Sequence, residues 1–77
     1  MNLKYGIEEK KTGETVVIYG VTCEIIKWRW SGSKSRFRTA FRFTVPGWTE
    51  CTIDGAGAAE RTIRGRLDAA VRNTMGI

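Results

Sequence analysis

Histidine is absent from this 77-residue chain, and cysteine occurs only at Cys23 and Cys51. Without histidine, the side chain that most often shuttles protons at neutral pH is missing. The acidic residues are scattered and show no pair at a recognisable catalytic spacing. A tetrahedral zinc site needs four suitable ligands, which two distant cysteines do not supply. The sequence therefore predicts a protein that is not an enzyme and that uses no metal ion or other cofactor.

Long apolar runs are missing too, and none approaches the length of a membrane span. The N-terminal residues lack the pattern of a secretory signal. We therefore expect a cytoplasmic protein without a membrane partner. Because cytoplasmic thiols normally stay reduced, buried free cysteines are favoured over a Cys23–Cys51 disulfide, which is the alternative.

Acidic residues are missing from the whole segment between Ile25 and Thr49, which carries six basic residues. Over the full chain, 13 lysines and arginines oppose 8 acidic residues, which gives a net charge of +5. So large a charge on so short a chain indicates an anionic partner, either a nucleic acid or an acidic protein.

The pattern of apolar residues predicts one α+β domain over residues 1–77. Alternating and β-branched runs separated by Gly, Ser and Pro indicate strands, and apolar residues at helical spacing before Gly76 indicate a C-terminal helix. We expect a two-layer open-faced sandwich, in which an antiparallel sheet of four to five strands packs on that helix. The expected strands span about 3–9, 14–19, 22–30, 36–45 and 49–53, and the expected helix about 55–75.

The turn at Pro46-Gly47 determines how the last two strands pair. A two-residue loop would place Cys51 on the same face as the arginines. A three-residue loop instead places Phe43 opposite Cys51 and Phe41 opposite Ile53. Burial of these apolar side chains favours the three-residue loop.

Basic and aromatic residues alternate along the two central strands. Because strand side chains point in turn to opposite faces of a sheet, we expect the aromatic residues to lie under the helix and the basic residues to lie on the uncovered face. The expected aromatic face holds Trp28, Trp30, Phe37, Phe41 and Phe43, and the expected basic face holds Lys27, Arg29, Arg36, Arg38 and Arg42.

A face of five cations lowers folding stability through like-charge repulsion, so we expect it to have a function. Arginine recognises phosphate bidentately, which favours non-enzymatic binding of nucleic acid, mainly through phosphates. The order of strands then helix resembles, in architecture alone, the DNA-binding domains of integrase arm-type and plant AP2 proteins over about residues 22–75.

Two alternatives to nucleic-acid binding are open. In one, the chain is an inhibitor or regulator of phage or mobile-element type, and it binds a host nucleic-acid-processing or defence complex through the same basic surface or the helix. In the other, the basic face is merely solvated and keeps the protein soluble.

Two tryptophans, Trp30 and Trp48, are expected beside loops at strand ends. Partly exposed tryptophan is enriched at binding hot spots, so both are candidate anchors for a partner. Stacking of bases on Trp28 and Trp30 is a second interpretation, but for Trp28 packing in the core is favoured.

The outward side of the helix carries a stripe of small residues that includes Gly65, which costs about 1 kcal/mol relative to alanine in a helix. This stripe is a candidate contact for a second copy of the chain, as a homodimer, or for a partner protein. An unoptimised surface position is the alternative. The flanking basic residues are Arg61, Arg64 and Arg72.

Overall fold

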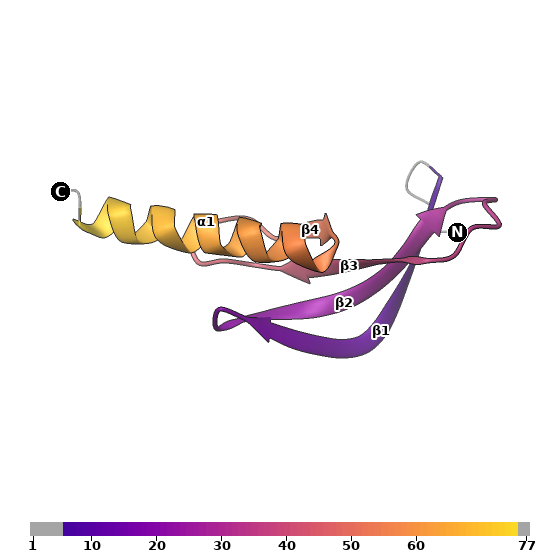
Figure 1. Ribbon diagram of the computed structural model, residues 1–77, viewed down its shortest axis with the longest axis horizontal. Coiled ribbons are helices and arrows are strands. Elements are labelled where there is room, and N and C mark those ends of the chain that lie inside the picture. The colour runs from indigo at the N-terminus through magenta and orange to yellow at the C-terminus, as the bar shows by residue number, and fades with distance from the viewer. Residues whose placement is uncertain (1–5, 76–77) are drawn as a thin grey trace.

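The computed structural model describes residues 6–75, the last three without their side chains. Four strands form one antiparallel sheet in the order β1-β2-β3-β4, and a helix follows the last strand (Figure 1). The predicted α+β architecture is confirmed. No helix in this part of the chain is long and apolar enough to cross a membrane. The elements are β1 (Ile7–Ile18), β2 (Val21–Trp30), β3 (Arg38–Phe43), β4 (Cys51–Asp54) and α1 (Ala56–Met75).

Strand β1 takes the place of two strands that the sequence indicated at about 3–9 and 14–19. Its register with β2 shifts between Lys11 and Thr15, and the expected turn is a bulge. There the Thr12 hydroxyl donates a hydrogen bond of 2.8 Å to the carbonyl of Ile25 in β2. This contact keeps the bulged segment attached to the sheet. Residues 3–5 lie outside the described residues.

The turn between β1 and β2 consists of Tyr19 and Gly20, whose φ angles are 49° and 79°. Two positive φ angles are characteristic of a type I′ turn, which matches the twist of the strands that it joins. The tight turn fixes the pairing of Ile18 with Val21.

The pairing of β3 with β4 follows the prediction. Phe41 lies opposite Ile53 and Phe43 lies opposite Cys51. Both strands are shorter than expected, and the loop 44–50 between them is closed by a hydrogen bond of 2.9 Å from the Trp48 N–H to the Val45 carbonyl.

The core lies between α1 and the face of the sheet that carries Phe41 and Phe43. Ala59 and Ile63 of the helix are fully buried in this cluster, together with Val45 from the loop. The first part of α1 therefore holds the helix on β3 and β4.

Asp54 precedes the helix and is of a residue type favoured as an N-cap, but it does not take that position in α1. The Ala59 N–H donates to the Gly55 carbonyl at 3.0 Å, which makes Gly55 the N-cap residue. The Asp54 carboxylate instead accepts a hydrogen bond of 3.0 Å from the indole Nε1 of Trp28. The Asp54 carboxylate is therefore engaged by a side chain of the sheet and not by the N–H groups at the start of the helix.

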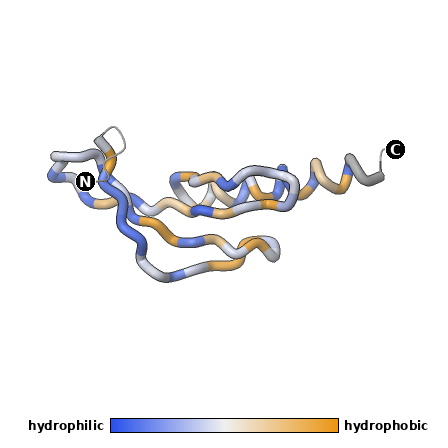
Figure 2. Tube along the Cα trace, turned by 180° about the vertical axis from the view of Figure 1, so that it is seen from behind, coloured by the Kyte–Doolittle hydropathy of each residue, from blue (hydrophilic) through white to orange (hydrophobic). Residues whose placement is uncertain are grey.

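The second part of α1 extends beyond the sheet in both views (Figures 1 and 2). Val71 follows the buried Ile63 at helical spacing, yet it is 55% exposed. The molecule measures 50 × 22 × 18 Å, and its radius of gyration is 14.6 Å, against about 11.5 Å for a compact domain of this length. Among the side chains that the structure describes in α1, full burial is confined to Ala59 and Ile63 in its first half.

Candidate functional site

The predicted separation of aromatic and basic faces holds for β3, whose Phe41 and Phe43 lie in the core under the helix, but it is wrong for β2, whose two faces are exchanged. Trp28 lies opposite Arg38, and Ile25 lies opposite Phe41. Directly opposed residues share a face of the sheet, so Trp28 lies with the arginines of β3 on the side away from the helix. A slip of one residue exchanges the two faces of a strand. Here the core takes Ile25 and Cys23 in place of the tryptophans.

No single face therefore holds the five predicted cations. Lys27, which pairs with Thr39, lies on the helix side of the sheet. By strand alternation Arg29 lies on the same side, whereas Arg38 and Arg42 lie on the opposite side. Arg36 precedes β3 and belongs to the hairpin loop.

Three of the five cations nevertheless come together at the end of the β2–β3 hairpin. They line a hollow of about 370 Å³, here called the hairpin pocket. This end of the molecule is largely hydrophilic in Figure 2. The residues that line the hairpin pocket are Arg29, Trp30, Ser33, Ser35, Arg36 and Arg38.

Hydrogen bonds within the loop hold the hairpin pocket in shape. The Ser33 N–H donates to the Trp30 carbonyl at 3.0 Å, and the Ser35 N–H donates to the Ser33 hydroxyl at 3.0 Å. The Arg29 guanidinium donates to the Ser35 carbonyl at 3.4 Å. The serines thus order a loop whose composition alone suggests only flexibility.

Two of the three arginines in the hairpin pocket have acidic neighbours. Arg29 lies 3.3 Å from the Glu8 carboxylate, and Arg38 lies 3.8 Å from that of Asp54, with the Arg38 side chain 63% exposed. Arg36 is exposed and forms no ion pair with any residue that the structure describes. Because exposed ion pairs contribute little free energy, an incoming anion can compete with Asp54 for Arg38, and Arg36 is available without such competition.

The other two predicted cations are engaged elsewhere. The Lys27 ammonium donates a hydrogen bond of 2.6 Å to the Thr39 hydroxyl. Arg42 binds both carboxylate oxygens of Glu9, at 3.0 and 2.9 Å, and donates to the Thr52 hydroxyl at 2.9 Å. The contacts of Arg42 connect β1, β3 and β4 across the open face of the sheet, which is a structural role.

Lys10 is a cation that the sequence did not assign to this end of the molecule. Its ammonium lies 4.3 Å from the centre of the Phe37 ring, and the Arg29 guanidinium lies 4.4 Å from the same ring. Lys10 reaches this position because it pairs with Lys27, and that register depends on the merged strand β1. No local sequence signal could have indicated it.

The two candidate anchors lie at different places. Trp30 is 57% exposed, and its ring meets that of Trp28 edge to face, with the centroids 5.5 Å apart. Trp48 is 46% exposed, and the Arg66 guanidinium lies 4.8 Å from its ring. Only Trp30 lies beside the three arginines, and the role of either as an anchor stays a prediction.

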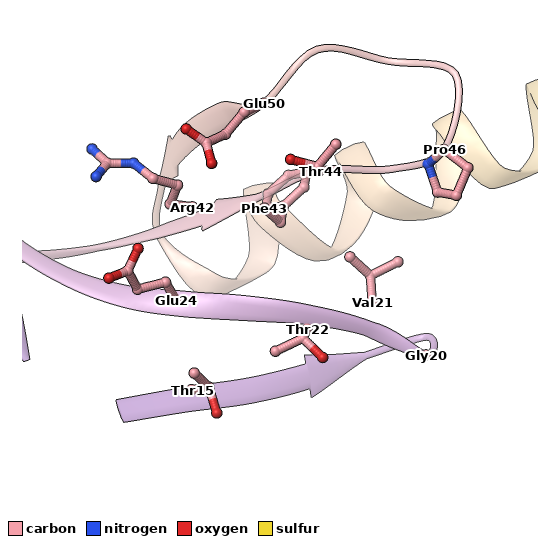
Figure 3. A pocket seen from close by; sticks show the side chains of 10 residues that line it. All are labelled: Thr15, Gly20, Val21, Thr22, Glu24, Arg42, Phe43, Thr44, Pro46 and Glu50. Atoms are coloured by element: carbon pink, nitrogen blue, oxygen red, sulfur yellow. The ribbon is translucent and has the colours of Figure 1, made fainter. Parts of the chain in front are cut away.

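Two further hollows lie along the sheet. The larger, of about 460 Å³, brings Glu24 and Glu50 close to Arg42, as Figure 3 shows. The smaller, of about 270 Å³, has the buried Ile26 and Ala40 among its lining residues. Acidic side chains border both, so both fit a polyanion less well than the hairpin pocket does.

Both cysteines are free, as the sequence favoured. Burial raises the pKa of the Cys23 thiol above its ordinary value, and the nearby Cys51 adds to the rise. The Cys51 sulfur accepts a hydrogen bond of 3.2 Å from Arg66. Within residues 6–75 no group of three or more potential ligands could hold a metal ion.

No known protein family matches this chain, and no curated protein or solved structure is significantly similar to it. Function therefore has to be inferred from the geometry of the chain itself.

Proposed function

We propose that this protein binds nucleic acid without catalysing a reaction, and that it does so mainly through phosphate contacts at the hairpin pocket. The observation that carries the proposal is the convergence of Arg29, Arg36 and Arg38 on one ordered hollow. Arginine forms strong, charge-assisted and often bidentate hydrogen bonds with phosphate oxygens.

The wider surroundings of the hairpin pocket support this function. The segment between Ile25 and Thr49 has no acidic residue, and Lys34 in the loop is exposed. On the helix side of the sheet, Lys10 adds one more cation nearby, because its ammonium and the Arg29 guanidinium lie against the same Phe37 ring. A nucleic-acid backbone that crosses the hairpin end would thus meet positive charge on both sides.

The test is a titration of the protein with labelled duplex DNA, single-stranded DNA and RNA at several salt concentrations. Phosphate contacts release counterions, so the logarithm of the affinity is expected to fall linearly with the logarithm of the salt concentration. Three arginine contacts predict a slope of about −2 to −3. Absence of binding to every one of these probes at low salt would contradict the proposal.

A second candidate function is regulation of an acidic or nucleic-acid-processing protein, as a phage-type inhibitor would do. The exposed Trp30 beside arginines favours it, because tryptophan and arginine dominate protein–protein hot spots. Such a partner would saturate the protein at one partner molecule per chain. Its affinity would not show the linear dependence on the logarithm of the salt concentration that is expected for a nucleic acid. Either function places the protein in the cytoplasm, which fractionation of cells would test.

The outer face of α1 is the candidate surface for a second copy of the chain. Arg61, Arg64 and Arg72 are exposed there, and a Cβ atom added at Gly65 would meet no atom within 4 Å. This space leaves room for the close approach of another helix.

Replacing Gly65 with leucine tests this surface. The variant is expected to raise the thermal stability of the monomer, because leucine favours a helix by several tenths of a kcal/mol to about 1 kcal/mol over glycine. It is also expected to abolish self-association, measured by analytical ultracentrifugation. If Gly65→Leu self-associates like the parent protein, the outer face of α1 is not an interface.

A further inference from the structure

We propose that the hairpin pocket selects single-stranded nucleic acid, with one unstacked base lying on the indole of Trp30. This inference rests on the proposed function and specifies its ligand. It is carried by the exposure of Trp30 at the pocket where Arg29, Arg36 and Arg38 converge.

Trp30 is held ready for stacking by its neighbours. The edge-to-face contact with Trp28, whose ring plane is inclined at 83° to that of Trp30, supports one side of the ring. Trp28 is fixed in turn by its hydrogen bond to Asp54, at 3.0 Å. On the other strand, Ile7 pairs with Trp30. More than half of the Trp30 surface nevertheless faces solvent, and an apolar ring so exposed can accept a base.

The arginines are placed where the phosphates of the same strand would lie. Trp28 lies opposite Arg38 at the end of the paired strands, and beyond this pair Arg36 of the hairpin loop lines the hairpin pocket together with Trp30. Arg38 follows on the same face, with its guanidinium 5.6 Å from the Trp28 ring. Aromatic platforms beside a basic groove bind single strands through base stacking and phosphate contacts together.

A duplex fits this arrangement less well. Its bases are paired and stacked on one another, so no base face is available to Trp30, whereas an unpaired strand can splay a base outward. A duplex would use only the arginines. The arrangement therefore predicts that Trp30 discriminates between the two forms of nucleic acid.

The experiment compares Trp30→Ala, Trp30→Phe and the parent protein by fluorescence anisotropy, with a labelled oligothymidine strand and a labelled duplex. Trp30→Ala is expected to lower the affinity for the single strand by about 5- to 100-fold and to leave the affinity for the duplex within about twofold. Trp30→Phe, which keeps a ring, is expected to retain most of the affinity.

Trp48→Ala is the comparison variant at the other candidate anchor, because Trp48 is also exposed and also lies beside an arginine but does not line the hairpin pocket. It should bind both probes as the parent protein does, and thermal melts should show that all variants are folded. If the parent protein binds but Trp30→Ala weakens neither probe, or weakens both equally, the stacking inference is wrong and the proposed function stands. If the parent protein binds neither probe at low salt, the proposed function is wrong, and this inference fails with it.

Discussion

Reversing Arg36 and Arg38 to glutamate is expected to weaken nucleic-acid binding by about 60-fold or more at about 0.1 M salt. Each arginine that neutralises a phosphate contributes nearly one unit of salt slope, which amounts to about eightfold in affinity at this salt concentration. Loss of two contacts gives the lower bound, and repulsion by the new carboxylates adds to it. Anisotropy titrations measure the affinity. The salt slope of the neutral variant with both residues changed to alanine should fall by about two units.

The fold should survive this change. Both side chains are exposed, and the single ion pair that is lost, between Arg38 and Asp54, is long at 3.8 Å and largely solvated. Such pairs contribute at most about 1 kcal/mol. The thermal midpoint of the double variant should therefore lie within about 8 °C of the parent value.

A matched control separates a defined site from general attraction by a basic protein. Arg61→Glu/Arg64→Glu removes the same charge, four units from the net charge of +5, at two exposed positions on the helix. If binding occurs at the hairpin pocket, this control should lose little nucleic-acid affinity. If binding depends on net charge alone, both double variants should lose the same affinity. Equal losses would show that the hairpin pocket has no special role.

The two hairpins of the central sheet show how far the sequence determines the fold. At Pro46-Gly47 the short turn and the apolar residues after it leave one favourable register, and the pairing of Phe43 with Cys51 follows from it. The loop 31–37 between β2 and β3 is no longer than the loop 44–50, but it is polar, so it permits several registers. Strand β2 has isoleucine at both Ile25 and Ile26, so either of its faces can be buried.

The candidate site lies on the β2–β3 hairpin, whose register the sequence left undetermined. The alternation of basic and aromatic residues predicted binding by arginine, yet the register separated Arg42 and Lys27 from the other cations. The hairpin pocket itself depends on the hydrogen bonds of Ser33 and Ser35, and no periodicity encodes them. The sequence was enough to name arginines as candidate binding residues, whereas the tertiary structure was needed to show which of them converge on one pocket.

Tertiary contacts also overrode a local preference at Asp54. An aspartate before a helix is a favoured N-cap, but here its carboxylate is taken by the Trp28 indole and approached by Arg38. This is possible because Ala40, which lies opposite Asp54 in β3, is also paired with Ile26 of β2. Strands β2, β3 and β4 thus place the side chains of Trp28, Arg38 and Asp54 on the open face of the sheet.

Replacing Ile63 with alanine is expected to destabilise the protein severely, whereas the same truncation at Val71 should be almost neutral. Helical spacing assigns both residues to one apolar stripe, but Ile63 is 0% exposed and Val71 is 55% exposed. Removal of a buried isoleucine side chain costs about 2–5 kcal/mol, through lost burial and the cavity left behind. A domain of this length has a total stability of about 4–12 kcal/mol.

Thermal unfolding followed by circular dichroism measures both variants. In a domain of this size, 1 kcal/mol shifts the midpoint by about 4–8 °C, so Ile63→Ala should melt at least about 10 °C lower or be unfolded at room temperature. Val71→Ala should shift by less than about 4 °C, since surface substitutions change stability by about 0.5 kcal/mol. A large loss of thermal stability in Val71→Ala would mean that the end of α1 packs against another surface in solution. A concentration-dependent midpoint would then identify that contact as a second copy of the chain.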